Sequence, residues 1–187
     1  MASPRHVIDP YPENSPDLEG EFALAAPEYV FYLLFQATRQ RDIAFDKLLA
    51  VHDLNVACWR TLAIVRRVSG CTMKVLARLS AIDRTTLTRC VDQLVERGLI
   101  KREVPAKDRR KVCLRLTKAG GGVYDKAVLT LLDFNKANVR GVDPDKLREA
   151  ARTLQAILRN ILADDDLAAD ILSFGRPPPD GAQGKLK

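Results

Sequence analysis

Two short helical patterns follow one another closely in residues 72–118, TMKVLARLSAIDRTTLTRCVDQLVERGLIKREVPAKDRRKVCLRLTK. Thr72 can cap a first helix over Met73–Leu79, and Asp83 can cap a second over Arg84–Arg97. Only the tripeptide Ser-Ala-Ile lies between the end of the first pattern and the second cap. Such a short connection between two helices is typical of a helix-turn-helix.

The second of these helices has one apolar and one polar face. Leu87, Val91 and Leu94 are spaced i, i+4 and i+7, which predicts a buried stripe. The opposite face carries the polar residues Arg84, Thr85, Thr86, Thr88 and Arg89. In the major groove of DNA, arginine can read guanine bidentately, and threonine can donate, accept or touch a thymine methyl. We therefore expect this face to contact bases or phosphates, although Arg84 could equally pair with an acid of its own chain.

Residues 99–116 change from a helical to an alternating pattern. Ile100, Val112 and Leu114 alternate with polar residues, which predicts two strands of a hairpin with one apolar face. Residues 105–110, PAKDRR, form a charged connection that is too long for a two-residue turn. A helix-turn-helix followed at once by a basic hairpin is a winged helix-turn-helix, and arginines at the hairpin tip suit the narrow minor groove.

Longer helices are expected on both sides of this unit. A first helix should cover 27–51, and a second should begin after the cap Asn55. A further helix should run from the cap Thr117 to about residue 139, and a last one should begin at the cap Asp143. Apolar residues of this last helix recur at spacings of 4, 3, 4 and 3: Leu147, Ala151, Leu154, Leu158 and Ile161. This spacing forms a seam for another helix.

We therefore expect a mainly α (α+β) fold, a winged helix-turn-helix with a helical dimerisation region built from the N- and C-terminal helices. The first and last helices cannot bury their apolar faces alone, so a homodimer is expected. The expected divisions are a flexible tail (1–20), a dimerisation helix (21–53), the DNA-binding lobe (54–117), C-terminal dimerisation helices (118–173) and a second flexible tail (174–187). Proline-rich composition at both ends is the basis for the two tails.

The basic charge of the chain is concentrated in this same central region. The 187 residues carry 30 Lys and Arg against 24 Asp and Glu, a net charge of +6. Residues 84–118 alone contain eleven basic and four acidic residues, so this segment carries +7 and the rest of the chain −1. A local basic excess favours a polyanionic partner such as DNA, although a solvated charged face is the simpler alternative.

Composition also excludes several classes of protein. No apolar run approaches the length of a membrane span and no secretory signal begins the chain, which predicts a soluble cytoplasmic protein without a membrane partner. The four cysteines, Cys58, Cys71, Cys90 and Cys113, form no CxxC pair, which argues against a zinc site and against structural disulfides. We expect Cys90 to be half-buried, and Cys58 and Cys113 to be partly exposed.

Several short motifs resemble those of the multiple antibiotic resistance regulator (MarR) family. They are WR-x-L from Trp59, LA-x-L from Leu76, ID-x-T-x-LTR-x-VD-x-L from Ile82, GLI-x-R from Gly98, DRR from Asp108 and LT-x-x-G from Leu116. The resemblance covers about residues 54–122, and the spacing from DRR to LT is its most specific part. The sequence departs from the pattern at Val75, where an acid is common, and at Cys90, where an aliphatic residue is common.

The resemblance implies a homodimer whose two lobes meet successive turns of a pseudo-palindromic operator. It also implies that Arg110 enters the minor groove and that Asp108 braces the wing. The full set of expected DNA contacts is Thr72, Arg84, Thr85, Thr86, Thr88, Arg89, Lys107, Asp108, Arg109 and Arg110. Thr72 and the backbone N–H groups beside it are placed to hold a phosphate.

The same resemblance implies a pocket for a small, perhaps aromatic, effector. Its expected lining residues are Phe35, Arg39, His52, Trp59 and Arg60. For Trp59, packing in the core is the stronger alternative, and His52 is expected to cap a helix end or face solvent rather than bind a metal.

Three functional classes follow from these observations. The first is a dimeric, sequence-specific transcription regulator, a repressor released from its operator by a ligand. The alternatives are a thiol-based redox sensor on the same scaffold and a low-specificity architectural DNA-binding protein. An enzyme is not expected, because no nucleophile–base pair, carboxylate dyad, phosphate loop or metal-ligand spacing appears. No cofactor is expected.

Overall fold

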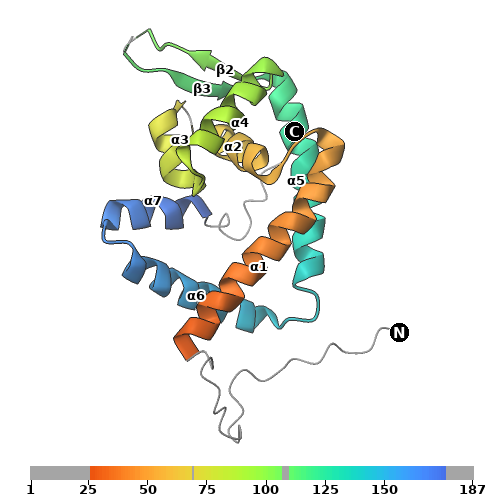
Figure 1. Cartoon of the computed structure of the whole chain (residues 1–187), viewed down its shortest axis with the longest axis vertical. Helices are drawn as coiled ribbons and strands as arrows, with labels where there is room; N and C mark the ends of the chain where they lie inside the picture. Colours follow the sequence, from red (N-terminus) through yellow and green to blue (C-terminus); the bar gives the residue numbers. More distant parts are fainter. Residues whose placement is uncertain (1–25, 69, 107–109, 176–187) are drawn as a thin grey trace, which may run out of the picture. The chain divides into compact units, whose positions relative to one another are not determined.

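The computed structural model describes residues 26–68, 70–106 and 110–175. In chain order the elements are α1 (Ala26–Leu49), the 3-10 helix η1 (Ala50–His52), α2 (Val56–Arg67), β1 (Cys71–Thr72), α3 (Met73–Ser80), α4 (Arg84–Glu96), β2 (Ile100–Glu103), β3 (Cys113–Leu116), α5 (Lys118–Asn138), α6 (Pro144–Ile161) and α7 (Asp165–Gly175) (Figure 1). The predicted mainly α, winged helix-turn-helix fold is confirmed: α3 and α4 form the helix-turn-helix, and the β2–β3 hairpin is the wing.

Packing divides the chain into two units, Met1–Ala44 and Phe45–Lys187. In the first unit the structure describes the N-terminal part of α1. The second unit contains the last residues of α1 and all later elements, so the winged helix-turn-helix lies within one unit. The predicted boundaries of the dimerisation regions stay predictions.

The polar residues predicted as N-caps all occupy that position. Asn55, Thr72, Asp83, Thr117 and Asp143 begin α2, α3, α4, α5 and α6, and each accepts a hydrogen bond from a backbone N–H inside its helix. The donor–acceptor distances run from 2.7 Å for Asp143 to 3.3 Å for Thr72. Each cap satisfies a backbone N–H that has no partner within its helix, and together the caps define where the helices begin.

A three-stranded antiparallel sheet, in the order β1-β3-β2, joins the wing to the helix-turn-helix. β3 pairs with β2 through Ile100 and Leu116, and with β1 through Thr72 and Cys113. Thr72 therefore ends a strand and caps α3 at once. The two-residue strand β1 was not predicted, because its pairing partner lies about forty residues further along the chain.

The core lies mainly between α2, α4, the sheet and α5. Leu62, Leu87, Val91 and Leu94 are fully buried. Trp59 is 5% exposed and stacks on Tyr124 of α5 at 5.1 Å between ring centroids. Trp59 is therefore a core residue, and of the two roles expected for it, core packing is the one observed.

The helix α7 was not predicted as a separate element. It begins beside Asp164, whose carboxylate accepts a hydrogen bond from the N–H of Leu167 at 2.8 Å. Its residue Ala168 is buried, while Ile171 and Phe174 are half-buried. α7 packs against α3 and α6, so it adds a wall beside the first helix of the helix-turn-helix.

Within the described residues, no single helix is long and apolar enough to cross a membrane. Two helical segments that meet at a bend of 74° have the length and apolar composition of a membrane span only when they are taken together. They are Glu28–His52 and Val56–Arg67.

The wing meets α5 at a point where only glycine fits. The N–H of Thr117 donates to the carbonyl of Leu99 at 3.0 Å, and its hydroxyl donates to the carbonyl of Gly98 at 2.7 Å. A Cβ added to Gly120 would lie 2.0 Å from the carbonyl oxygen of Leu99. The first turn of α5 can therefore approach the β2 strand only with glycine at this position.

Replacing Gly120 with Ala is expected to lower the free energy of unfolding by about 3 kcal/mol, because backbone must move to admit the methyl group. Gly121→Ala is the matched control: a Cβ there meets nothing within 4 Å. In a helix interior that change should raise stability by about 0.5–1 kcal/mol. Urea denaturation of both variants measures the difference. Equal stability of the two variants would contradict this account of the junction.

Candidate nucleic-acid interface

The exposed face of α4 is determined by the stripe that the helix buries. Because Leu87, Val91 and Leu94 point into the core, Arg84, Thr85, Thr88 and Arg89 are left exposed. Thr86 is half-buried, and its backbone N–H donates to the Asp83 carboxylate at 2.9 Å. This hydrogen bond holds the pKa of Asp83 below its usual range. The predicted polar face is therefore presented as a surface, with Thr86 at its margin.

Hydroxyl and guanidinium groups on this face keep hydrogen-bonding capacity for a ligand. The hydroxyl of Thr88 donates to the carbonyl of Arg84 at 2.8 Å, so its oxygen can still accept a hydrogen bond from a base. Among the described residues, no acid forms an ion pair with Arg84 or Arg89. The alternative partner expected for Arg84, an acid of its own chain, is thus not found in that part of the structure.

A groove of about 510 Å³ lies beside α4, between α3, α4 and β2. Its lining residues are Met73, Lys74, Ala77, Arg84, Leu87, Thr88 and Arg102. Three of these are cations, and two of the three, Lys74 and Arg102, were not predicted as site residues. Lys74 could have been identified from its place two residues after the cap Thr72. Arg102 could not, because its proximity to α4 depends on how the hairpin folds back.

Ion pairs join the wing to α4 and its two strands to each other. Arg102 Nη2 lies 2.5 Å from Asp92 Oδ1, which ties β2 to α4. Glu103 contacts Lys101 at 2.5 Å and also pairs with Arg115 across the hairpin. Lys101, with Arg115 adding to it, holds the pKa of Glu103 below its usual range. Each pair is partly exposed and therefore screened by solvent, so the main effect of these pairs is to orient the strands.

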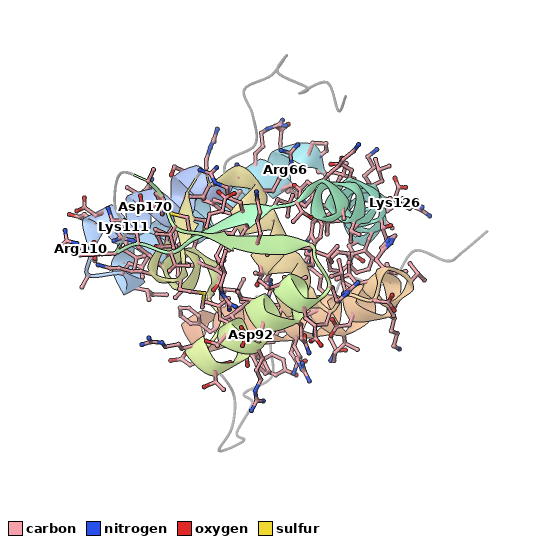
Figure 2. All side chains as sticks on the ribbon, turned by 90° about the horizontal axis from the view of Figure 1, so that it is seen from above. Arg66, Asp92, Arg110, Lys111, Lys126 and Asp170 are labelled. Atoms are coloured by element: carbon pink, nitrogen blue, oxygen red, sulfur yellow. The ribbon has the colours of Figure 1, made fainter. Side chains whose placement is uncertain are left out.

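The tip of the wing carries exposed cations. Arg110 and Lys111 are exposed and lie at the end of the hairpin far from α5, where Lys126 is labelled (Figure 2). Lys107, Asp108 and Arg109 lie outside the described residues. The predicted brace by Asp108 therefore stays a prediction, while the pairs of Asp92 and Glu103 provide bracing that was not predicted.

Thr72 is half-buried, and its hydroxyl oxygen accepts from the N–H of Val75 at 3.3 Å. Its observed role is therefore that of a helix cap. The backbone N–H groups at the start of α3 remain the predicted phosphate contact.

The predicted effector residues are divided between the two units. Phe35 and Arg39 are exposed residues of the first unit, and the other three belong to the second. Trp59 and Arg60 line a cavity of about 230 Å³ together with Leu79 and Phe174. His52 ends η1, and its carbonyl accepts from Arg97 at 3.2 Å. The five-residue pocket as a whole stays a prediction.

The cysteines are all buried, so the predicted exposures of Cys58, Cys90 and Cys113 are wrong. Cys58 and Cys90 face each other between α2 and α4, and Cys113 lies beside β1. Hydrogen bonding to Cys58 and burial raise the pKa of Cys90, while its own bond to Cys90 lowers the pKa of Cys58. Burial raises the pKa of Cys71 to about 11. In the described part of the chain, no group of His, Cys, Asp and Glu residues is arranged to hold a metal ion.

Comparisons with known proteins agree with this geometry. A family model described as "MarR family" matches residues 52–111, which include α2, the helix-turn-helix and β2 and end before β3. The crystal structure of a MarR-family transcriptional regulator from Silicibacter pomeroyi is similar, with a TM-score of 0.64 and 27% identity. The similarity covers 74% of this chain and 93% of that one.

Two further relatives were solved with ligands. CouR from Rhodococcus jostii RHA1, bound to p-coumaroyl-CoA, has a TM-score of 0.64 and 24% identity over 72% of this chain and 95% of its own. A mutant MarR from Escherichia coli, complexed with operator DNA, has a TM-score of 0.64 and 22% identity over 70% and 94%. At these identities the likeness concerns the fold. The sequence of the E. coli MarR protein is 24% identical over 131 residues, which is 70% of this chain and 88% of MarR.

Burial of the four thiols predicts slow alkylation of the native protein, because the reagent cannot reach them. For Cys71 and Cys90 a raised pKa also keeps the thiol protonated at pH 7.5, and only the thiolate reacts. We expect the four cysteines to react with iodoacetamide far more slowly in the folded protein than in 8 M urea, about a hundredfold or more. For Cys71 the rate should rise only as the pH approaches about 11. Mass spectrometry of timed samples measures each site. A cysteine that reacts as fast in the native as in the unfolded protein would contradict this account.

Proposed function

The chain belongs to the MarR family of winged helix-turn-helix transcriptional regulators, and from this premise we propose that it binds a pseudo-palindromic operator as a homodimer and represses transcription until a small molecule releases it. The observation that carries the proposal is the exposed face of α4. Its arginines have no acidic partner among the described residues, and it lies beside a cationic groove and a basic wing.

On DNA, α4 would enter the major groove, where Arg84, Thr85, Thr88 and Arg89 meet base edges or phosphates. Thr86 would contribute less, because it is half-buried at the helix start. Arg110 and Arg109 would enter the minor groove, whose potential is most negative where it is narrow. Lys107 and the N-terminus of α3 beside Thr72 would contact the phosphate backbone, which supplies affinity without sequence preference. The E. coli MarR mutant solved with operator DNA supports this arrangement by analogy of fold.

A dimer would cover apolar surfaces that each unit leaves exposed. In the first unit, Phe31, Tyr32, Leu33 and Phe35 of α1 are all more than 40% exposed. In the second unit, α6 buries none of its residues within the described chain, although it carries the predicted apolar seam. Extended apolar surface of this kind marks an interaction site. We therefore assign α1 and α6 to the interface with a second copy.

An effector would act by changing the spacing of the two lobes. A ligand that binds only one spacing shifts the population towards it, and half-sites one helical turn apart no longer fit. The complex of CouR with p-coumaroyl-CoA supports a small-molecule effector here, and the residues proposed for it remain Phe35, Arg39, His52, Trp59 and Arg60. Because its partner is DNA, we propose a cytoplasmic location.

The other two functions have less support. Burial of every cysteine and the raised pKa of Cys90 and Cys71 disfavour a thiol-based sensor. A low-specificity architectural protein would need backbone contacts alone, whereas the Arg and Thr side chains of α4 offer groups suited to reading bases.

Substituting one arginine on the proposed interface should weaken specific DNA binding. Arg89→Ala is expected to raise the Kd for a specifically bound duplex about 10–100-fold, and Arg110→Ala to do the same while lowering the slope of log K against log salt by about 1. Fluorescence anisotropy at several salt concentrations measures both effects. Lys126→Ala, at an exposed position on α5, is the matched control and should leave Kd unchanged. If Arg89→Ala and Arg110→Ala both bind as tightly as the control, the proposed interface is wrong.

A further inference from the structure

The helix α7 is attached to α3 through a small contact. Among its described residues only Ala168 is buried, at 4% exposure. Its larger apolar residues are half-buried: Leu167, Ile171, Leu172 and Phe174. An isolated helix of 11 residues is marginal in water, so α7 is helical mainly because it is docked. Release from α3 would therefore unfold α7, a local opening that costs less free energy than global unfolding.

The interface between the two helices is incompletely filled. A cavity of about 570 Å³ lies between α3, α7 and the end of α2. Val75 and Leu79 of α3 line one side of it, and Ser173 and Phe174 of α7 line the other. Well-packed protein interiors leave few voids larger than a water molecule, so α7 makes fewer dispersion contacts here than a core helix does.

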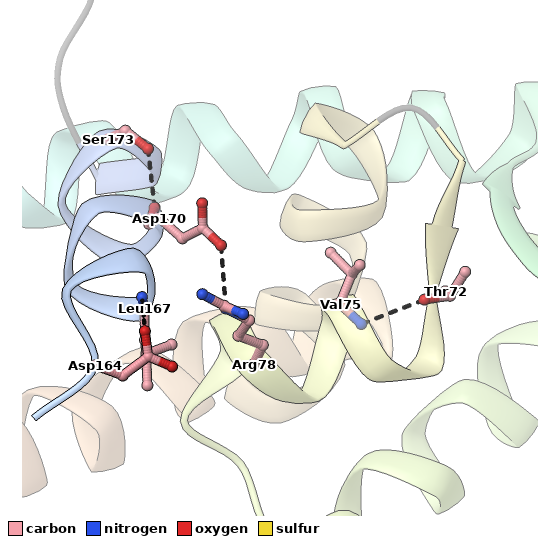
Figure 3. A network of polar contacts seen from close by, with 7 residues as sticks. All are labelled: Thr72, Val75, Arg78, Asp164, Leu167, Asp170 and Ser173. Carbon is pink, nitrogen blue, oxygen red and sulfur yellow. Dashed lines mark hydrogen bonds and ion pairs between the residues drawn. The ribbon is translucent and has the colours of Figure 1, made fainter. Parts of the chain in front are cut away.

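The polar contacts that hold α7 are also weak. Arg78 Nε lies 3.0 Å from Asp170 Oδ2 (Figure 3), yet among the described residues it meets no acceptor in hydrogen-bond geometry. Asp170 is 57% exposed, and an exposed ion pair is screened by solvent. The guanidinium of Arg67 adds a cation–π contact, 4.5 Å from the centroid of the Phe174 ring. These contacts can be broken without disturbing the core.

The two helices carry opposite charges. Residues 164–175 contain four acids and no base, a net charge of −4: Asp164, Asp165, Asp166 and Asp170. All four acids are exposed. The helix α3 contains two cations and no acid: Lys74 and Arg78. Docked α7 therefore places an excess of negative charge beside the cations of α3.

These two cations belong to the helix that meets the DNA backbone in a helix-turn-helix. In this motif the first helix, here α3, crosses the backbone while the second enters the major groove. Lys74 is exposed and lines both the cavity beside α7 and the groove beside α4. Arg78 follows four residues later, on the same side of α3. The cations of α3 that can contact phosphates are thus the ones next to α7.

We propose that α7 is an autoinhibitory helix that competes with DNA for α3. In the docked state Asp170 pairs with Arg78, and the carboxylates of α7 repel phosphates that approach Lys74. In the released state Lys74 and Arg78 bind two further phosphates of the backbone. DNA binding therefore favours release of α7, and docking of α7 lowers DNA affinity. This inference rests on the proposed DNA-binding function.

The variant Ala168→Gln tests the proposal in the full chain. A longer neutral side chain does not fit at this buried position, so it displaces α7 while all four acids stay in the chain. We expect the Kd for a mixed-sequence duplex at low salt to fall about threefold to tenfold, and the slope of log K against log salt to steepen by about 1–2. Fluorescence anisotropy at several salt concentrations measures both. Ala169→Gln, at the exposed neighbouring position, is the matched control and should change neither.

A second substitution identifies the cation that α7 covers. In the Ala168→Gln chain, Arg78→Gln should remove about one unit of the added slope, because one phosphate contact is lost. Phosphate contacts carry no sequence preference, so Ala168→Gln should tighten binding to a selected and to a scrambled duplex by the same factor. If α7 only braced α3, Ala168→Gln would weaken DNA binding and leave the slope unchanged. That result, or an unchanged Kd, overturns the proposal.

Hydrogen exchange provides a test in the unaltered chain. Saturating duplex should speed exchange of the α7 amides about tenfold or more, because bound DNA releases the helix. Exchange that is unchanged or slower in the complex overturns the proposal. If the chain bound all duplexes equally, the proposed operator recognition would fail, while the comparison of Ala168→Gln with Ala169→Gln would still decide the role of α7. A chain that bound no duplex at all would overturn both.

Discussion

The orientation of α4 depends on the burial of Leu87, Val91 and Leu94 against the rest of the core. Removing each of these side chains from water contributes about 2 kcal/mol, so rotation of the helix about its axis would expose apolar surface at a cost of several kcal/mol. With 3.6 residues per turn, the opposite face of the helix, with Arg84, Thr85, Thr88 and Arg89, must then face solvent. The same burial that stabilises the domain therefore determines which side chains are presented to a partner.

The wing is positioned relative to that face by several smaller interactions. The sheet joins β2 and β3 to the strand that precedes α3, and the Arg102–Asp92 pair ties the hairpin to α4 directly. At the base of the hairpin, the close approach of Gly120 to Leu99 joins the wing to α5. The sheet, one ion pair and the α5 junction thus fix the wing and α4 relative to each other.

Local signals explain why much of the fold could be predicted from the sequence. The five caps act within one helical turn, and the apolar stripe of α4 and the alternation of the hairpin are periodic over short windows. Interactions between distant residues were not predictable in this way. The strand β1 exists only through Cys113, and the burial of Cys58 depends on where α4 packs. The position of Arg102 beside Asp92 likewise follows from the folded hairpin. α7 does have a local signal, the Asp164 cap before an apolar run, but its effect on the molecule depends on its packing against α3.

We propose that two copies of this chain read a two-fold-symmetric DNA sequence with α4 and the wing. Bound duplexes should be selected from a random DNA pool, and the winner titrated by anisotropy beside a scrambled duplex. We expect a site with inverted half-sites about 10 bp apart, preferred by roughly 10³-fold or more over the scrambled duplex. Equal affinity for every duplex, lost steeply as salt rises, would contradict it and leave α4 and the wing as a non-specific phosphate clamp.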